Sequence, residues 1–139
     1  MMSKVSRISI SIEETLLEKF EKFLEDNNFP SRSEGIKYLI RSLLVEQEWA
    51  AGTNIAASLS IVYDHHKSGL MEKLVSIQHD FEQLVVCSQH VHLDHLNCME
   101  VLVLKGDAAE VKELHTRLMS VKGLKHCSLM KGTTGENVG

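Results

Sequence analysis

The chain has 139 residues, of which 43% are hydrophobic and 24% charged, a composition that fits a soluble globular protein. No apolar run approaches the roughly 20 residues that span a bilayer. The first residues, MMSKVSRISI, lack the apolar core of an export signal, so we expect a cytoplasmic protein that does not enter a membrane. The three cysteines are then expected to be free thiols or metal ligands rather than disulfides.

The net charge of −4 argues mildly against nucleic-acid binding. The first twelve residues, however, include Lys4 and Arg7 and no acidic residue. A narrow basic face can still dock on phosphates, because only charges within a Debye length act there. Composition therefore leaves DNA binding open.

Residues 7–12 alternate strictly between polar residues and isoleucine, which predicts a strand with Arg7, Ser9 and Ser11 on one face. A lone strand has no neighbour within its own segment, so we expect it to pair with the same strand of a second subunit.

Two helices are predicted after this strand, separated by a break at Asn27–Pro30. Capping boxes at Ser11–Glu14 and Ser31–Glu34 are expected to begin them. The first domain is thus predicted over residues 1–50 as a dimeric βαα unit, with a linker at 51–54.

The pattern after the linker predicts a second domain over residues 55–131, followed by a disordered tail at 132–139. Its order is strand, helix, two strands, helix and strand, which is the ferredoxin-like βαββαβ arrangement of an α+β protein. The four strands are expected over 55–63, 83–93, 97–104 and 124–130. Two domains of this size bury little apolar surface each, so we expect cores shared between subunits.

The densest chemical signal is the segment from Gln89 to Cys98. His90 and His92 stand two apart on a predicted strand, so both imidazoles project from the same face. Cys98 follows just across a turn, and His79 at the end of the preceding helix is a fourth candidate that could serve a neighbour's site. Three imidazoles and one thiolate suit Zn²⁺ if tetrahedral and Ni²⁺ or Cu²⁺ if square planar, and the spacing alone does not fix that geometry.

The remaining histidines and cysteines carry weaker signals. His65 and His66 are expected to be solvent-exposed at a strand–helix junction, and His115 and His126 lack ligand-like neighbours. Cys87, between valines, is expected to be a small buried residue. No Ser/His/Asp set, glycine-rich phosphate loop or paired acid emerges, so we expect no enzyme.

Taken together, the two halves resemble the nickel-responsive transcriptional regulator (NikR) family along nearly the whole chain, the tail excepted. The stretches Arg7–Ile12 and Ser31–Glu34 are similar to the ribbon-helix-helix superfamily, whose β-ribbons enter the major groove. His79, His90–His92, Cys98 and the run Glu100–Gly106 match the metal-binding signature of the family's ACT-like domain.

The resemblance implies a transcriptional repressor that works as a homotetramer, a dimer of two ribbon dimers, on double-stranded operator DNA. It implies one Ni²⁺ per subunit, held in a square plane by His90, His92 and Cys98 of one subunit with His79 of another. It also implies supporting roles around the ion for three further residues, Tyr63, Gln78 and Glu100.

The same resemblance implies that bases are contacted by Arg7, Ser9 and Ser11. The resemblance also implies that DNA phosphates are contacted by the start of the second helix near Ser33, by Lys37 and by Lys67. Two positions depart from the family pattern. Glu34 matches one ligand of a second cation site, but Tyr38 stands where its acidic partner is expected, and Ser68 replaces a basic residue.

Three alternative hypotheses stay open at this point. An amino-acid-sensing DNA-binding regulator with an ACT-like domain would need no high-affinity nickel. A zinc-stabilised ribbon-helix-helix protein of the antitoxin kind would have a toxin partner and no metal control of DNA affinity. A small metalloenzyme would need an open coordination position, which four protein ligands do not leave.

Overall fold

The computed structural model describes residues 3–52 and 54–139. The chain divides into two compact units, Met1–Ile40 and Arg41–Gly139. This division falls inside the second helix, ten residues before the predicted boundary, because that helix continues to Ala51. The predicted linker at 51–54 includes Thr53, which lies outside the described residues. Within the described part of the chain, no helix is long and apolar enough to cross a membrane.

The first unit contains helix α1 (Glu14–Asp26) and the beginning of α2 (Arg32–Ala51). One half of the capping box predicted at the start of α2 is present, because the Glu34 backbone N–H donates to Ser31 Oγ at 3.2 Å, whereas the Glu34 carboxylate pairs with Lys37. The box predicted at Ser11 is wrong. Helix α1 is capped by Glu13, whose carbonyl accepts hydrogen bonds from the backbone N–H groups of Leu16 and Leu17.

The strand predicted over residues 7–12 does not form in the single chain, where residues 3–13 have no regular secondary structure. Ile8 and Ile10 are 70% and 67% exposed. The physical reason is the one that the sequence pattern implied: a strand needs a neighbour for its backbone N–H and C=O groups, and this segment has none within its own chain.

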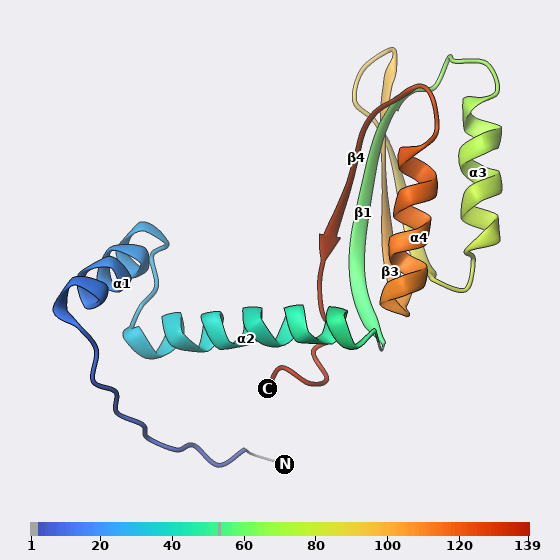
Figure 1. The fold of residues 1–139 in the computed structure, drawn as a ribbon. Helices are drawn as coiled ribbons and strands as arrows, with labels where there is room; N and C mark the ends of the chain where they lie inside the picture. Colours follow the sequence, from blue (N-terminus) through green and yellow to red (C-terminus); the bar gives the residue numbers. More distant parts are fainter. Residues whose placement is uncertain (1–2, 53) are drawn as a thin grey trace. The chain divides into compact units, whose positions relative to one another are not determined.

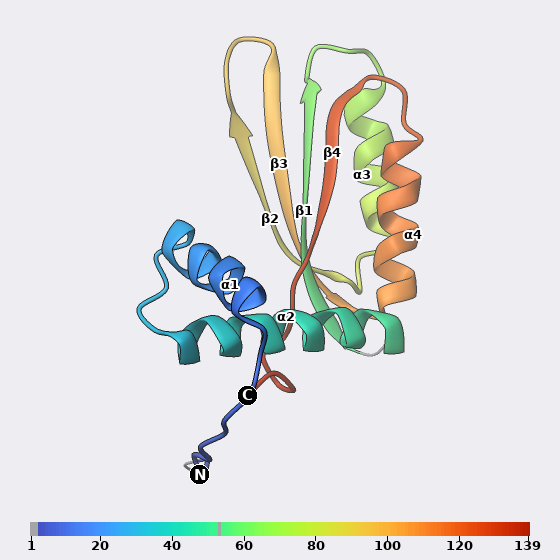
Figure 2. The same cartoon turned by 60° about the vertical axis from the view of Figure 1, so that its left-hand side comes forward.

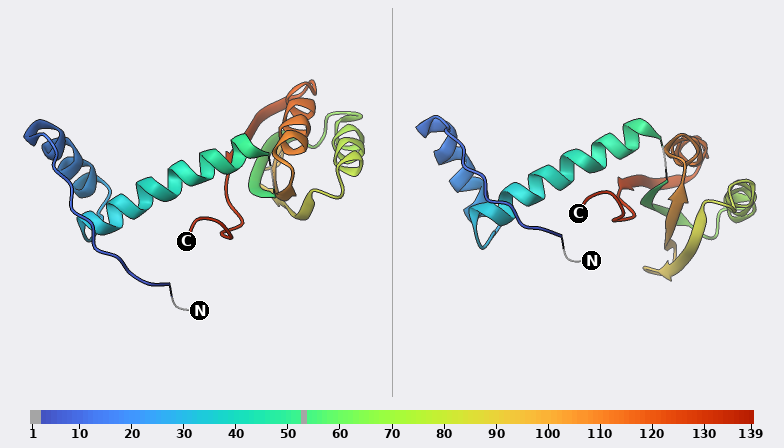
Figure 3. Two further views of the ribbon diagram at one scale, coloured as in Figure 1. Left: turned by 60° about the horizontal axis from the view of Figure 1, so that its bottom comes forward. Right: turned by 90° about the horizontal axis from the view of Figure 1, so that it is seen from below.

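The second unit is a four-stranded antiparallel sheet with two helices on one of its faces (Figures 1 and 3). Figure 2 shows the strands in the order β2-β3-β1-β4, which is the ferredoxin-like arrangement and confirms the predicted βαββαβ order. The elements are β1 (Ile55–Asp64), α3 (Leu70–Asp80), β2 (Val85–His92), β3 (Asn97–Gly106), α4 (Ala108–Met119) and β4 (Leu124–Lys131).

The core of this unit lies between the sheet and its two helices, because alternate residues of β1 and the inner stripe of α4 are apolar. Its most deeply buried aliphatic side chains include Ile55, Leu59, Ile61, Leu102, Leu104, Leu114 and Leu118. Trp49, from the last turns of α2, joins the same core and is 2% exposed. The end of α2 is therefore part of the second unit.

Residues 132–139 form no helix or strand, but they make contacts that we had not predicted. The Trp49 indole N–H donates to the carbonyl of Gly132 at 3.0 Å. The Arg41 guanidinium donates to the carbonyls of Val138 and Gly139. The end of the chain thus lies along the second half of α2.

Gly106 ends β3 at the point where the chain approaches Leu84, just before β2 begins. Its φ of 155° is one that side-chain-bearing residues rarely adopt. A Cβ at this position would lie 2.5 Å from Cδ2 of Leu84, which is itself 2% exposed. The close approach fixes the start of β2 against β3, where the Lys105 N–H donates to the Leu84 carbonyl.

We predict that Gly106→Ala lowers the free energy of unfolding by about 1–3 kcal/mol, from backbone strain and overpacking together. Thermal unfolding at fixed protein concentration measures the destabilisation. Gly135→Ala is the matched control, because Gly135 also has a positive φ but a Cβ there would meet no atom within 4 Å. Equal destabilisation in the two variants would contradict the role given to the packing against Leu84.

Candidate metal centre

The register between β2 and β3 brings predicted donors face to face. In this antiparallel pair His92 lies opposite Cys98, and His90 lies opposite Glu100. Directly opposed residues on one face of a sheet have neighbouring side chains. The side chain of His92 therefore lies beside that of Cys98, and the side chain of His90 beside that of Glu100. The prediction that Cys98 faces the His-x-His strand is confirmed.

A tight turn holds this register. The Asp94 carboxylate accepts hydrogen bonds from the backbone N–H groups of Leu96 and Asn97, each at 2.8 Å, and from the Asn97 side chain. These bonds, that of the Asn97 side chain first, lower the pKa of Asp94 to about 2. The turn is therefore locked by a carboxylate that stays ionised at any physiological pH.

Cys98 is the centre of the donor group. Its Sγ lies 3.2 Å from Nδ1 of His92 and 3.1 Å from Nδ1 of His65. Burial raises the pKa of the Cys98 thiol, and the negative charges of Asp64 and Asp94 raise it further. The metal-free chain therefore carries the neutral thiol here, and an ion that binds the sulfur must displace its proton.

The donors present fit a late divalent metal ion. With bonds of about 2.3 Å to sulfur and about 2.0 Å to nitrogen, a sulfur and a nitrogen on one ion stand about 3.0 Å apart at a right angle and about 3.5 Å apart at a tetrahedral angle. The separations of 3.1 and 3.2 Å from Cys98 Sγ lie between these two values. A thiolate beside imidazoles is also a donor set of the kind that zinc, nickel and copper accept.

His65 is the residue that the sequence analysis missed. It was expected to be exposed, but it is partly buried and belongs to one donor group with His92 and Cys98. The pairing of β1 with β3 brings His65 to this group. It sets Tyr63 opposite Cys98, so the residues that follow β1 lie next to the turn between β2 and β3. There the His65 N–H donates to the Leu96 carbonyl at 3.2 Å. No spacing along the sequence reveals this neighbourhood.

His90 projects next to a buried phenol. The Tyr63 hydroxyl lies 3.4 Å from His90 Nδ1 and donates to the Glu100 carboxylate at 3.5 Å. Burial, followed by the negative charge of Glu100, raises the pKa of Tyr63 to about 12. The phenol thus keeps its proton and orients the Glu100 carboxylate beside the histidine. The His90 and His92 rings are 5.2 Å apart between centroids.

His79 is not joined to these donors within one chain. It lies on the last turn of α3, its side chain is 76% exposed, and its Nδ1 lies 3.5 Å from a carboxylate oxygen of Glu82. Gln78 and His79 line a surface pocket of that helix together with Val75, Glu82 and Val85. His66 pairs with Asp64 and forms with Asp64 and His65 a second group of potential ligands. Among the described residues neither His115 nor His126 belongs to such a group.

One expectation about cysteine is wrong. Cys87 is exposed on β2, at the place where the pairing of β2 with β3 shifts register. Cys87 lies opposite Val103, which is itself 40% exposed, so it is on the face of the sheet that the two helices do not cover.

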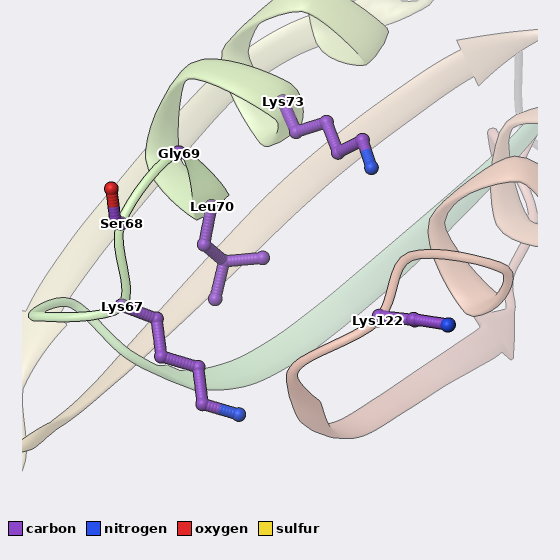
Figure 4. Close-up of a pocket in the computed structure, with 6 residues that line it drawn as sticks. All are labelled: Lys67, Ser68, Gly69, Leu70, Lys73 and Lys122. Atoms are coloured by element: carbon purple, nitrogen blue, oxygen red, sulfur yellow. The ribbon is translucent and has the colours of Figure 1, made fainter.

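The residues predicted to contact DNA are accessible. Arg7, Ser9 and Ser11 precede α1 and are exposed, as are Ser33 and Lys37 in the first turns of α2. Lys37 forms an ion pair with Glu34, and no group of potential metal ligands in the described chain includes Glu34. Figure 4 shows Lys67 with two further lysines in a pocket at the start of α3 lined by Lys67, Ser68, Gly69, Leu70, Lys73 and Lys122.

Comparisons with known proteins agree with this geometry. Residues 56–131 match the family described as the NikR C terminal nickel binding domain. A putative nickel-responsive regulator of Nitratidesulfovibrio vulgaris is 49% identical over 99% of both chains. One of Methanococcus maripaludis is 45% identical, also over 99% of both. A solved structure of an uncharacterized protein from Thermotoga maritima, 16% identical, superposes with a TM-score of 0.52 over 56% of this chain and 96% of its own, which supports the fold alone.

These relatives are named as regulators, in agreement with the expectation that the chain is not an enzyme. The family match covers all four strands and both helices of the second unit from the second residue of β1 on, and the relatives match over nearly the whole length. The chain therefore belongs to the family of nickel-responsive regulators that carry the NikR C-terminal nickel-binding domain.

Proposed function

We propose that this chain is a transcriptional repressor whose binding to double-stranded operator DNA is promoted by Ni²⁺. The observation that carries the proposal is the contact between His92 and Cys98, 3.2 Å apart on paired strands within the segment that matches a nickel-binding family. When bound, nickel supplies a positive centre to which donors of two subunits can attach.

The proposed ligand set takes His90, His92 and Cys98 from one subunit and His79 from another, with one ion per subunit in a square plane. His90 stands on the same face as His92, and its contact with the ring and hydroxyl of Tyr63 restricts the orientation of its ring. His79 is exposed at a helix end and is in no donor group of its own chain, so it is free to reach a neighbour's site. Gln78, beside it, would support the shared site.

Exposed apolar side chains favour an assembly around this site. Val91, Leu93 and Leu96 surround the turn between β2 and β3 and are 40%, 51% and 51% exposed. Val75 lies one helical turn before His79 and is 61% exposed. Apolar surface that borders both halves of a divided site is expected to be buried between subunits. A homotetramer made of two ribbon dimers would bury it.

The first unit supports the ribbon dimer. Ile8 and Ile10 are exposed in the single chain, as are the helix residues Leu16, Leu39 and Ile40. Pairing of two copies of residues 7–12 would satisfy the strand backbone and cover these side chains, which yields a ribbon-helix-helix domain. The opposite face of the ribbon would then present Arg7, Ser9 and Ser11 to bases in the major groove.

Phosphate contacts follow from charge and helix geometry. The amino end of α2 near Ser33 carries the positive end of the helix dipole, and Lys37 adds a positive charge nearby. In the second unit Lys67 lies exposed beside Lys73 and Lys122, so this pocket is a second basic surface for the DNA backbone (Figure 4).

The coupling between nickel and DNA is a difference in binding free energy between arrangements of the subunits. His79 of one subunit can reach His90, His92 and Cys98 of another only in some of these arrangements. Where it does, α3 is held at its end and the two ribbon dimers are held at one spacing, which favours a grip on both operator half-sites. The ligands must hold nickel more tightly in that arrangement, because equal affinity would shift nothing.

We predict that nickel produces a thiolate charge-transfer band in the near ultraviolet and that Cys98→Ala abolishes it, because a coordinating thiol is deprotonated. A nickel titration followed by absorbance, with operator binding measured on the same samples, tests the proposal. Cys87→Ala is the matched control, since that thiol is exposed and stands apart from the donor group. A band that survives in Cys98→Ala would contradict the assignment.

Mixing two variants tests whether the site is shared between subunits. His79→Ala and Cys98→Ala should each lack the square-planar nickel band. In mixed assemblies some interfaces pair an intact His79 with an intact set of His90, His92 and Cys98, so the band should return in proportion to subunit exchange. Exchange is followed independently by mass spectrometry of labelled chains. If exchange occurs and no band returns, each subunit builds its whole site alone.

We predict that Arg7→Ala weakens operator binding by about 1–3 kcal/mol for each bidentate hydrogen-bonded pair with a base that it removes, and more where two copies act together. Nickel binding and the tetramer should be unchanged, as measured by absorbance and by light scattering. Arg7→Lys keeps the charge but not the planar fork of donors, so it should restore non-specific binding more than operator preference. Wild-type preference in Arg7→Ala would show that another face contacts the bases.

A further inference from the structure

The last turn of α3, which carries Gln78 and His79, is tied to α4 by one arginine. The Arg117 guanidinium donates a hydrogen bond to the Asp80 carboxylate at 2.9 Å. Its Cζ atom lies 5.3 Å from the centroid of the Phe81 ring, over which the cation stacks. Asp80 and Phe81 directly follow His79 in the sequence. A single side chain of α4 therefore contacts the two residues that come after the proposed fourth nickel ligand.

Both sides of this contact, which we call the α3–α4 latch, stand on well-packed backbone. Phe81 is buried, and its N–H closes the end of α3 by donating to the Gln78 carbonyl at 3.1 Å. Arg117 stands on α4 next to the buried Leu114 and Leu118. The two helices lie side by side on one face of the sheet (Figures 1 and 3). The latch therefore connects the end of α3 to a rigid neighbour.

The side chains of this turn that would meet another subunit do little to hold it in the single chain. The His79 side chain is 76% exposed, and Val75, one turn earlier, is 61% exposed. Helix ends that bury few side chains open more readily than the core does. A ligand on such an end is in position for only a fraction of the time, and the apparent affinity for the metal falls by that fraction.

We propose that Arg117 is a positioning residue for the shared nickel site, because the α3–α4 latch keeps the last turn of α3, and with it His79, in place before nickel arrives. The inference rests on the proposed function, since it needs His79 as a ligand given to another subunit. The latch lies within one chain, so each subunit prepares the ligand that it donates. Less conformational freedom is then lost when nickel binds, and the site responds at a lower nickel concentration.

Hydrogen–deuterium exchange of the metal-free, full-length protein tests the first step. Arg117→Gln should speed exchange of the amides of residues 78–82 by about threefold to tenfold, the size expected when an exposed ion pair and a cation–π contact are lost together. Arg117→Lys keeps the charge but not the planar fork of donors, so its rate should be intermediate. Lys112→Gln is the matched control, because it removes the same charge from an exposed position of α4 and should leave this exchange unchanged.

Nickel affinity of the same variants, measured by competition with a chelator, tests the second step. Arg117→Gln should bind nickel about threefold to tenfold more weakly than the wild type, and Lys112→Gln should match the wild type. Charge alone predicts the opposite sign for Arg117→Gln. Without the guanidinium, the Asp80 carboxylate beside His79 would be left uncompensated and would attract the cation more strongly.

A third comparison separates positioning from a general loss of stability. In a His79→Ala background, Arg117→Gln should cause no further loss of nickel affinity, because the ligand that the latch positions is gone. A mere destabilisation of the second unit would weaken binding by the same factor in both backgrounds. Thermal unfolding shows that each variant is folded under the conditions of the titration.

The inference is overturned by unchanged exchange at residues 78–82 in Arg117→Gln, by nickel binding in this variant as tight as in the wild type or tighter, or by equal losses with and without His79. A nickel affinity that does not depend on His79 at all would overturn both the inference and the shared site. If the exchange and affinity results hold while nickel fails to promote operator binding, only the proposed repressor function fails.

Discussion

The register in which β2 pairs with β3 from Cys87 to His92 decides where the donors of the candidate centre lie. Side chains alternate between the faces of a strand, so a slip of one residue would carry His90 and His92 to the opposite face from Cys98. Two local features oppose such a slip: the Asp94 carboxylate that closes the turn, and the close approach of Gly106 to Leu84 at the other end of the pair. The metal chemistry thus depends on backbone geometry that involves no metal ligand.

The same register places the chemistry at the boundary of the core, and burial then sets its proton balance. Cys98 and Tyr63 are almost fully buried, and in both the loss of solvent is the first cause of a raised pKa. A thiol that holds its proton makes metal binding compete with protonation, so affinity for an ion falls as pH falls. The carboxylates of Asp64 and Asp94 raise the pKa of the Cys98 thiol further in the metal-free chain. With a cation bound, the same carboxylates would help to balance its positive charge.

Much of the second unit could be predicted from the sequence, because each of its elements carries its own periodicity. The strand expected over 55–63 is β1 (Ile55–Asp64), and the helix expected between the last two strands is α4. The predictions that failed concern residues whose neighbours lie far along the chain or are not supplied by the single chain. Residues 7–12 have the pattern of a strand but no partner, and His65 meets Cys98 only through the pairing of β1 with β3. The spacing of residues along the sequence predicts which side chains share a face of one helix or strand. It does not predict which helices and strands lie side by side, and a site is made of residues from several of them.

The features that the single chain leaves incomplete point to one requirement. The proposed assembly would supply a second copy of the chain to a strand pattern without a neighbour, to apolar side chains in solvent, and to a histidine at a helix end apart from the other donors. The donors His65, His92 and Cys98, by contrast, lie within one subunit. If nickel binds in the proposed shared site, its affinity is higher in those arrangements of the subunits that bring His79 to the other donors. Because a ligand shifts an equilibrium only by its differential affinity for the two states, that difference in affinity, and not the total affinity for nickel, would set the response to the metal.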